Sequence, residues 1–134
     1  MKIRIYYEDT DAGGIVYHAN YIKFCERARS EFLFSQNIMP GDGSSHGFVV
    51  RHMEVDYYAV AVLGDMLTVK SYILSVNNSS LQLLQDIYRE DVKLFSMKLT
   101  LVYVENCQSK SIPDYFRTLF TQTYQENRNN NILI

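Results

Sequence analysis

Apolar and polar residues alternate in the first stretch of the chain, and this alternation then gives way to a helical spacing. Residues 2–8 place Ile3 and Ile5 on one face, which predicts a strand. After Asn20, the expected N-cap, apolar residues recur every three or four positions and predict a helix that ends near residue 36. The residues on its apolar face are Tyr21, Phe24, Cys25, Ala28, Phe32 and Leu33. This face is broad, so the helix must lie against a flat partner, most simply a sheet.

Four further stretches have the pattern of strands. A loop at residues 37–47, with Pro40 and several glycines, separates them from the long helix. The predicted strands are residues 48–59, 66–76, 81–90 and 94–105. Asn77–Ser80 and Glu90–Asp91 read as tight turns, so the last three strands should be antiparallel neighbours.

The predicted order of elements indicates a single α+β domain. A strand and a long helix are followed by four antiparallel strands and a short helix at residues 114–124, so one sheet wraps around one long helix. The 134 residues suffice for one domain, which we expect at residues 1–126. Residues 127–134 form a polar tail that we expect to fray. One helix covers only part of such a sheet, so we expect a homo-oligomer, either a dimer or a tetramer.

Composition narrows the possible partners and the compartment. A net charge of −2 argues against nucleic acid as the main partner, because phosphate binding needs a clustered basic face. Cys25 and Cys107 fit no metal pattern, and we interpret them as reduced thiols of a cytoplasmic protein. We expect no transmembrane segment, because no apolar run approaches membrane-spanning length, and no signal peptide, because the N-terminus has a strand pattern.

The loop between the first strand and the long helix, residues 9–20, contains the candidate chemistry. Asp11 and His18 lie on either side of Gly13–Gly14, a pair that allows backbone turns forbidden to other residues. The helix start that follows offers free backbone N–H groups and a positive electrostatic end. A carboxylate, an imidazole and a helix start together suit attack on a carbonyl group.

Each of these residues also has a simpler interpretation. Asp11 would then only stabilise a turn, and His18 would be an ordinary surface or core group. A metal site built from Glu8, Asp9, Asp11 and His18 is another alternative, although these residues lack the tight spacing of a strong metal motif. Cys25 could pair with His18 as a nucleophile, but its place on the predicted core face favours a buried apolar role.

Two blocks of sequence match a known family. The first block consists of Tyr6–Tyr21 (YYEDTDAGGIVYHANY), Phe24, Glu26–Arg29 (ERAR) and Glu31. The second consists of Phe48–Arg51 (FVVR), Asp56–Tyr57 and Gly64–Asp65. These blocks closely resemble the YbgC branch of the hydroxybenzoyl-CoA thioesterase family, and the order of the predicted strands is compatible with that family.

The resemblance implies a fold, an activity and a site. The family has the hotdog fold, an antiparallel sheet wrapped around one long helix, and works as dimers or tetramers with acyl-CoA bound between subunits. It hydrolyses acyl-CoA thioesters without a metal ion or organic cofactor. By resemblance, Asp11 is the catalytic carboxylate, acting as general base or as nucleophile. His18 takes the helix-start position whose backbone N–H polarises the thioester carbonyl, and Tyr7, on the first strand, resembles a further site residue.

Two alternatives and two departures accompany this prediction. The alternatives are a hotdog enoyl-thioester hydratase and a non-enzymatic module that docks acyl carrier protein or an envelope complex. Many relatives have Pro-Ala before the Gly-Asp turn, where this chain has Val60–Ala61. Some relatives also use basic residues on the CoA nucleotide, in a turn that corresponds to Asn77–Ser80, and this turn has none.

Overall fold

The computed structural model describes residues 1–41 and 43–130. Its elements, in chain order, are β1 (Lys2–Arg4), the 3-10 helix η1 (Tyr7–Asp9), α1 (His18–Ser35), β2 (His46–Tyr57), β3 (Met66–Val76), β4 (Ser80–Arg89), β5 (Val92–Glu105), β6 (Gln108–Ser109) and α2 (Asp114–Asn130). The predicted and observed bounds agree within about two residues, except that β1 ends earlier, α1 begins earlier and α2 ends later than predicted.

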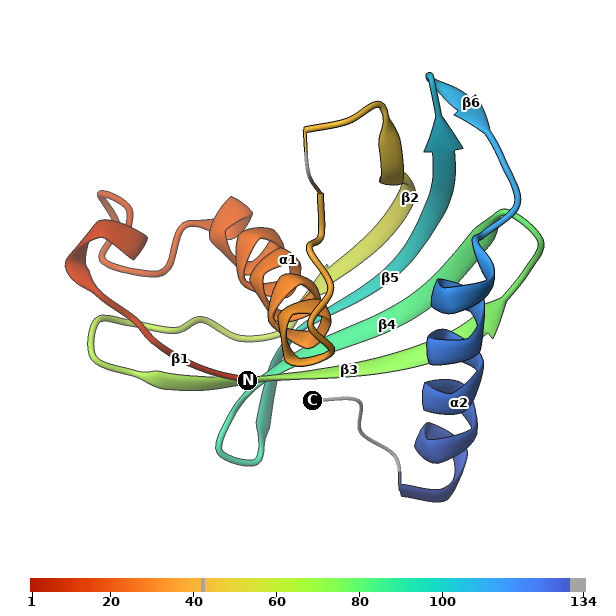
Figure 1. Cartoon of the computed structure of the whole chain (residues 1–134). Helices are drawn as coiled ribbons and strands as arrows, with labels where there is room; N and C mark the ends of the chain where they lie inside the picture. Colours follow the sequence, from red (N-terminus) through yellow and green to blue (C-terminus); the bar gives the residue numbers. More distant parts are fainter. Residues whose placement is uncertain (42, 131–134) are drawn as a thin grey trace.

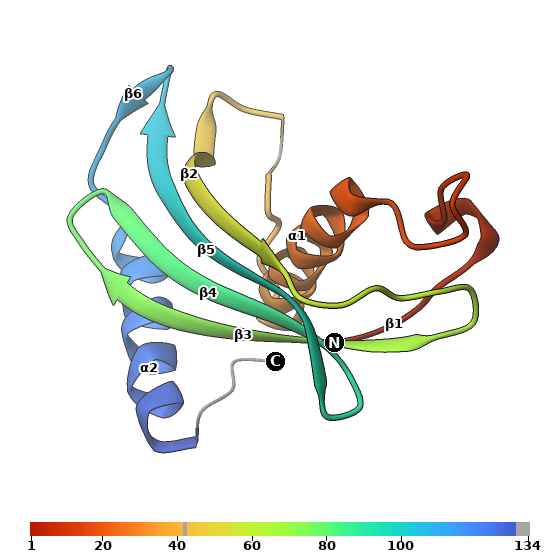
Figure 2. The same cartoon turned by 180° about the vertical axis from the view of Figure 1, so that it is seen from behind.

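The strands form one antiparallel sheet in the order β1-β3-β4-β5-β2, and the short β6 pairs with β5 outside this path. Strands β3, β4 and β5 are consecutive neighbours, as their tight turns predict. The sheet curls, and both helices lie on the same side of it, with α1 within the curve (Figure 1 and Figure 2). The predicted α+β hotdog arrangement is therefore confirmed.

The core lies between the helices and the sheet. Helix α1 buries Tyr21, Phe24, Cys25, Ala28 and Phe32, which is the face that the spacing predicts. Strand β3 buries every second residue from Leu67 to Ile73, also as predicted. Burial of these alternating faces supplies the main driving force for this arrangement.

The second helix closes the other end of the sheet. Helix α2 extends beyond the predicted end at residue 124 and reaches Asn130. Its buried Phe116 and Phe120 lie 5.2 Å and 5.7 Å from the ring of Phe48 on β2. The last part of the predicted polar tail, residues 131–134, lies outside the described residues.

The first strand is shorter than the alternation predicts. Only Lys2–Arg4 pair with β3, and the prediction of a strand through residue 8 is wrong. The carboxylate of Asp9 accepts the backbone N–H of Tyr6 at 2.9 Å, and the hydroxyl of Thr10 donates to the carbonyl of Tyr7 at 2.8 Å. These local bonds turn the backbone into η1 and away from the sheet.

The start of α1 also differs from the prediction. The helix begins at His18 with Tyr17 as its N-cap residue, so Asn20 lies inside the first turn. Asn20 does not cap the helix because its side-chain amide donates instead to the carbonyl of Asp9, at 2.9 Å. This bond ties the helix start to the preceding loop.

Candidate active site

The loop that carries Asp11 is a tight turn closed by its own backbone. The N–H of Asp11 donates to the carbonyl of Ile15 at 2.9 Å, and the N–H of Gly14 donates to the carbonyl of Asp11 at 3.0 Å. Gly14 has φ +82°, a conformation that other residues rarely adopt. The Gly-Gly pair therefore fixes where the Asp11 side chain begins.

The Asp11 carboxylate is held by one of its two oxygens. Oδ1 accepts the N–H of Gly13 at 2.8 Å, and a Cβ at Gly13 would lie only 3.2 Å from that oxygen. Among the contacts of the described residues, none involves the Oδ2 atom of Asp11. The carboxylate is thus oriented by the loop while one oxygen stays available to a ligand.

The same loop is fastened to the start of α1 and to the segment between β2 and β3. The carbonyl of Asp9 accepts the N–H of Tyr17 at 3.0 Å as well as the Asn20 amide. The N–H of Val16 donates to the carbonyl of Ala61 at 2.9 Å, and Val16 is buried. These contacts fix the distance between Asp11 and the helix start.

The first residue of α1 is His18, whose side chain is exposed. In residues 1–41 and 43–130, no hydrogen bond occupies its backbone N–H, as expected for the first turn of a helix. Its carbonyl accepts the hydroxyl of Tyr57 at 2.7 Å, and the two rings lie 6.4 Å apart. The sequence marks Tyr57 only as part of the second matching block and does not predict this bond.

Two tyrosines on α1 and β2 build the floor of the site. Tyr21 stacks on Phe95 with 5.4 Å between ring centroids, and Tyr57 packs edge-on against both rings. Burial raises the pKa of Tyr21 and of Tyr57, so both phenols stay neutral at physiological pH. A neutral Tyr57 keeps the proton that it donates to His18.

A surface hollow of about 350 Å³ brings the candidate residues together. Both Asp11 and His18 line it, together with Tyr57 and apolar residues of the loop. Tyr7 does not line it: its side chain is 83% exposed, and it lies in η1, not on the first strand as predicted. A site role for Tyr7 stays a prediction.

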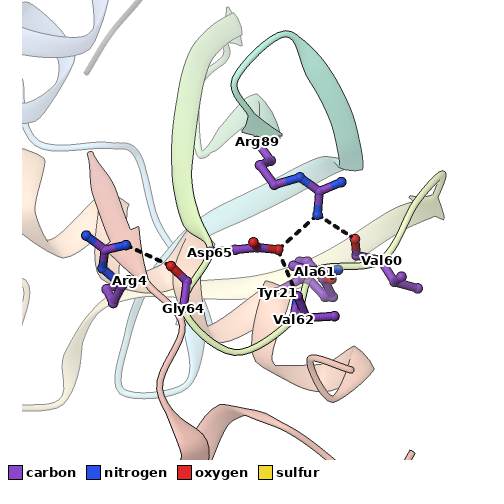
Figure 3. Close-up of polar contacts among 8 residues, drawn as sticks. All are labelled: Arg4, Tyr21, Val60, Ala61, Val62, Gly64, Asp65 and Arg89. Carbon is purple, nitrogen blue, oxygen red and sulfur yellow. Dashed lines mark hydrogen bonds and ion pairs between the residues drawn. The ribbon is translucent and has the colours of Figure 1, made fainter. Parts of the chain in front are cut away.

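The segment between β2 and β3 forms one wall of this hollow through Tyr58, Ala59 and Val60. An ion pair and several backbone hydrogen bonds hold this wall segment in place (Figure 3). Nη1 of Arg89 donates to the carbonyl of Val60 at 3.0 Å and to Oδ2 of Asp65 at 2.9 Å. The same Asp65 oxygen accepts the N–H of Val62 at 2.9 Å, and the N–H of Ala61 donates to the Tyr21 hydroxyl at 3.2 Å. The wall is thus joined both to β4 and to α1.

The same contacts determine the charge of Asp65, which forms an ion pair with Arg89. The backbone N–H of Val62, and after it Arg89, hold the pKa of Asp65 below its usual range. Asp65 is therefore ionised at neutral pH and keeps Arg89 in place. Arg4 adds a bond from the other side, from Nη1 to the carbonyl of Gly64 at 2.7 Å.

Both cysteines are free thiols, as predicted. Cys25 is buried in the core, and burial raises its pKa to about 12. The thiol is therefore protonated at neutral pH and unsuited to nucleophilic attack. Cys107 is exposed and lies in the turn between β5 and β6.

Two further findings concern metal ligands and membrane-spanning helices. Within the part of the chain that the structure describes, no three His, Cys, Asp or Glu side chains cluster closely enough to hold a metal ion. The described helices are also too short or too polar to cross a membrane.

Comparison with known proteins decides the family. The profile of the thioesterase superfamily matches residues 13–96, which include the Gly-Gly turn, α1 and the braced wall. The chain belongs to the thioesterase superfamily. It is 36% identical to the acyl-CoA thioesterase YbgC of Helicobacter pylori J99, over 90% of this chain and 98% of that protein. It is 46% identical to the acyl-CoA thioester hydrolase YbgC of Escherichia coli O6:H1, over 75% of this chain and 76% of that protein.

Solved structures of low sequence identity share the fold of this thioesterase superfamily member. The gentisyl-coenzyme A thioesterase BH1999 superposes with a TM-score of 0.81 at 23% identity, over 90% of this chain and 98% of that one. A hypothetical protein of Aquifex aeolicus superposes with a TM-score of 0.84 at 23% identity, over 90% of this chain and 97% of that one. The predictions of a YbgC-type thioester hydrolase and of its fold are confirmed.

Proposed function

We propose that the protein hydrolyses acyl-CoA thioesters to a free acid and CoA, with Asp11 and the backbone N–H of His18 as its reacting groups. The observation that carries this proposal is that Asp11 and His18 both line a single hollow at the start of α1. The loop bonds orient the Asp11 carboxylate, and the helix start supplies an N–H that no other group of the described chain uses.

The chemistry follows from where charge develops. When the thioester carbonyl lies at the helix start, the His18 N–H donates to its oxygen and stabilises the negative charge that forms there. With Asp11 as general base, water attacks the carbonyl carbon, its proton passes to the carboxylate, and the carbon–sulfur bond breaks to release the CoA thiolate. With Asp11 as nucleophile, its carboxylate oxygen attacks the carbonyl carbon, the carbon–sulfur bond breaks to release the CoA thiolate, and water then hydrolyses the resulting anhydride to the free acid and the Asp11 carboxylate.

An Asp11→Asn variant tests this proposal. The amide keeps the shape of the side chain and its bond from Gly13 but loses basicity and nucleophilicity, so kcat/KM should fall by ~10²–10⁴-fold. Glu8→Gln is the matched control, because it neutralises an exposed carboxylate of the same loop and should leave the rate unchanged. A folded Asp11→Asn protein that hydrolyses acyl-CoA at the wild-type rate would reduce Asp11 to a turn residue.

The assembly is part of the proposal, because β2 is a long edge strand without a buried residue. It ends the path of the sheet and leaves Val49, Val50, Met53 and Tyr57 exposed. A long apolar edge is the usual place for a second chain to pair. We therefore propose a homodimer, or a tetramer of two such dimers, and light scattering of the intact protein should give a mass well above 15.6 kDa.

The remaining assignments concern the surroundings of the enzyme. Free thiols at Cys25 and Cys107 support a cytoplasmic location, where thiols stay reduced. Acyl carrier protein carries the same thioester group and is a second possible acyl donor. Hydrolysis of one acyl group presented on CoA and on acyl carrier protein, compared side by side, distinguishes the two.

A further inference from the structure

A second, larger space begins one helical turn beyond the candidate active site. It has a volume of about 380 Å³ and is lined by residues of α1, α2 and the sheet. Ile22 of α1 begins it and Phe120 of α2 forms part of its far wall. Strand β2 lines both spaces, through Tyr57 at the hollow and through Met53 at the cavity. Both spaces thus lie along α1 and β2, in the direction that an acyl group with its carbonyl at His18 would extend.

The lining of the cavity is mostly apolar, and its polar residues, Glu26, Arg29 and Ser30, all lie on α1. The guanidinium of Arg29 is largely buried, and this burial lowers its pKa without removing its charge at neutral pH. Buried charges in proteins are normally paired. Within the described chain, however, no carboxylate lies within ion-pair distance of Arg29. Glu26 also lines the cavity, and its charge opposes the lowering of the Arg29 pKa, but its side chain is exposed to water and forms no ion pair with Arg29.

The pose of Arg29 is fixed by the amide of Gln85, which is fully buried on β4. The Nε2 group of Gln85 donates to the carbonyl of Cys25 at 2.9 Å and to the hydroxyl of Ser71 at 3.0 Å. This leaves its Oε1 to accept Nη1 of Arg29 at 2.8 Å. The guanidinium is thus held by one amino group, while its other N–H groups donate to no acceptor within the described chain. These are the donors that a bidentate carboxylate would use.

Resting on the proposed function, we infer that Arg29 determines specificity for acyl groups that end in a carboxylate, that is, mono-CoA thioesters of dicarboxylic acids. Arg29 follows His18 by close to three helical turns, so the two lie on one face of α1, with their Cα atoms about 16 Å apart. Side chains lean toward the start of a helix, so the guanidinium lies nearer to His18 than its Cα does. A chain of medium length would then place its thioester at His18 and its terminal carboxylate at Arg29.

The test compares thioesters that differ only at the far end of the acyl chain. Adipoyl-, suberoyl- and sebacoyl-CoA are assayed beside hexanoyl-, octanoyl- and decanoyl-CoA, and kcat/KM is measured for each. In the wild-type protein we expect the carboxylate-ended member of at least one pair to be preferred. Arg29→Met should lower kcat/KM for that substrate roughly 30-fold or more, as expected when one member of a buried charge pair is lost, and should leave its uncharged partner unaffected.

The control is Arg27→Met, which removes the same charge from the exposed side of the same helix. Arg27 lies over the ring of Phe24, 5.9 Å from its centroid, and does not line the cavity. Arg27→Met should leave unchanged the ratio of kcat/KM between the carboxylate-ended thioester and its uncharged partner. A loss of fold would lower both members of each pair together, so the ratio itself reports on recognition.

A second measurement needs no variant. Free sebacate should inhibit the wild-type enzyme more strongly than free decanoate, because only sebacate brings a second carboxylate to Arg29. If the enzyme hydrolyses the uncharged thioesters and shows neither this difference nor a preference within any pair, the inference is overturned and the proposed function stands. If it hydrolyses none of these thioesters, both are overturned.

Discussion

The hydroxyl of Tyr57 donates a 2.7 Å hydrogen bond to the backbone carbonyl of His18. It joins the end of β2 to the first residue of α1, which lines the hollow of the candidate active site. The bond therefore links the edge strand of the sheet to the position of the proposed carbonyl-binding group.

Replacing Tyr57 with Phe removes this hydroxyl and retains the edge-on packing of the ring against Tyr21 and Phe95. A single hydrogen bond of this kind contributes ~1 kcal/mol, so kcat/KM should fall about fivefold while the fold is retained. Tyr58→Phe is the matched control, because Tyr58 lines the same hollow but is 60% exposed. Equal losses in the two variants, measured on one acyl-CoA with circular dichroism to monitor folding, would argue against a role for the Tyr57–His18 bond.

The brace between Asp65 and Arg89 predicts a dependence of stability on pH. The folded pKa of Asp65 is lowered, so the unfolded chain binds more protons at acid pH and the contribution of Asp65 to stability is lost as pH falls through that lowered value. The contribution is fully present above the unfolded pKa of about 3.9. Asp65→Asn should thus cost ~1 kcal/mol at neutral pH and progressively less in acid.

Chemical denaturation of wild type and variant across this pH range measures the difference directly. Asp91→Asn serves as the control, since Asp91 is exposed in the turn between β4 and β5. A deficit for Asp65→Asn that stays constant down to the acid limit would show that loss of the charge is not what destabilises the variant.

The parts of this fold that could be predicted from sequence are those set by periodicity. The buried face of α1 and the alternation along β3 follow from residues close in the chain. The end of the first strand could not be predicted in this way, because the alternation continues past Arg4 to Ile5, while the Asp9 carboxylate turns the backbone at Tyr6.

The candidate site likewise contains residues that local sequence identifies and residues that it does not. Asp11 and His18 lie on one loop and could be identified together from their spacing and their resemblance to a family. Tyr57 is 39 residues from His18, and Arg89 is 29 residues from Val60. Only the pairing of strands brings these partners together, and no local pattern marks a tyrosine or an arginine that will bond to a distant carbonyl.

Neither cysteine should be needed for turnover. At neutral pH the Cys25 thiol, with its pKa raised to about 12, is protonated and buried, so alkylating agents should react with the exposed Cys107 alone and leave hydrolysis intact. Cys25→Ser places a hydroxyl in the core and should cost ~1–3 kcal/mol of stability, whereas Cys107→Ser should cost little. Hydrolysis that disappears on alkylation of a folded protein would contradict this assignment and reopen the pairing of Cys25 with His18.

The role of the His18 backbone can be separated from that of its side chain by two substitutions. His18→Ala removes the imidazole but keeps the N–H, so we expect a modest loss. His18→Pro removes both. Proline is tolerated at the first position of a helix, and Tyr17 before it has φ −61° and ψ 132°, a conformation that the residue before a proline readily adopts.

The proline variant should therefore fold, and its activity isolates one hydrogen-bond donor. Loss of an oxyanion donor typically lowers kcat by ~10²–10³-fold, and we expect His18→Pro to fall below His18→Ala by that factor. Tyr7→Phe should have the smallest effect, because the Tyr7 side chain is 83% exposed and does not line the hollow. The measurement is kcat on one acyl-CoA, with thermal unfolding of each variant as the check on folding. If His18→Pro and His18→Ala lose the same activity, the imidazole and not the backbone N–H is what the reaction requires.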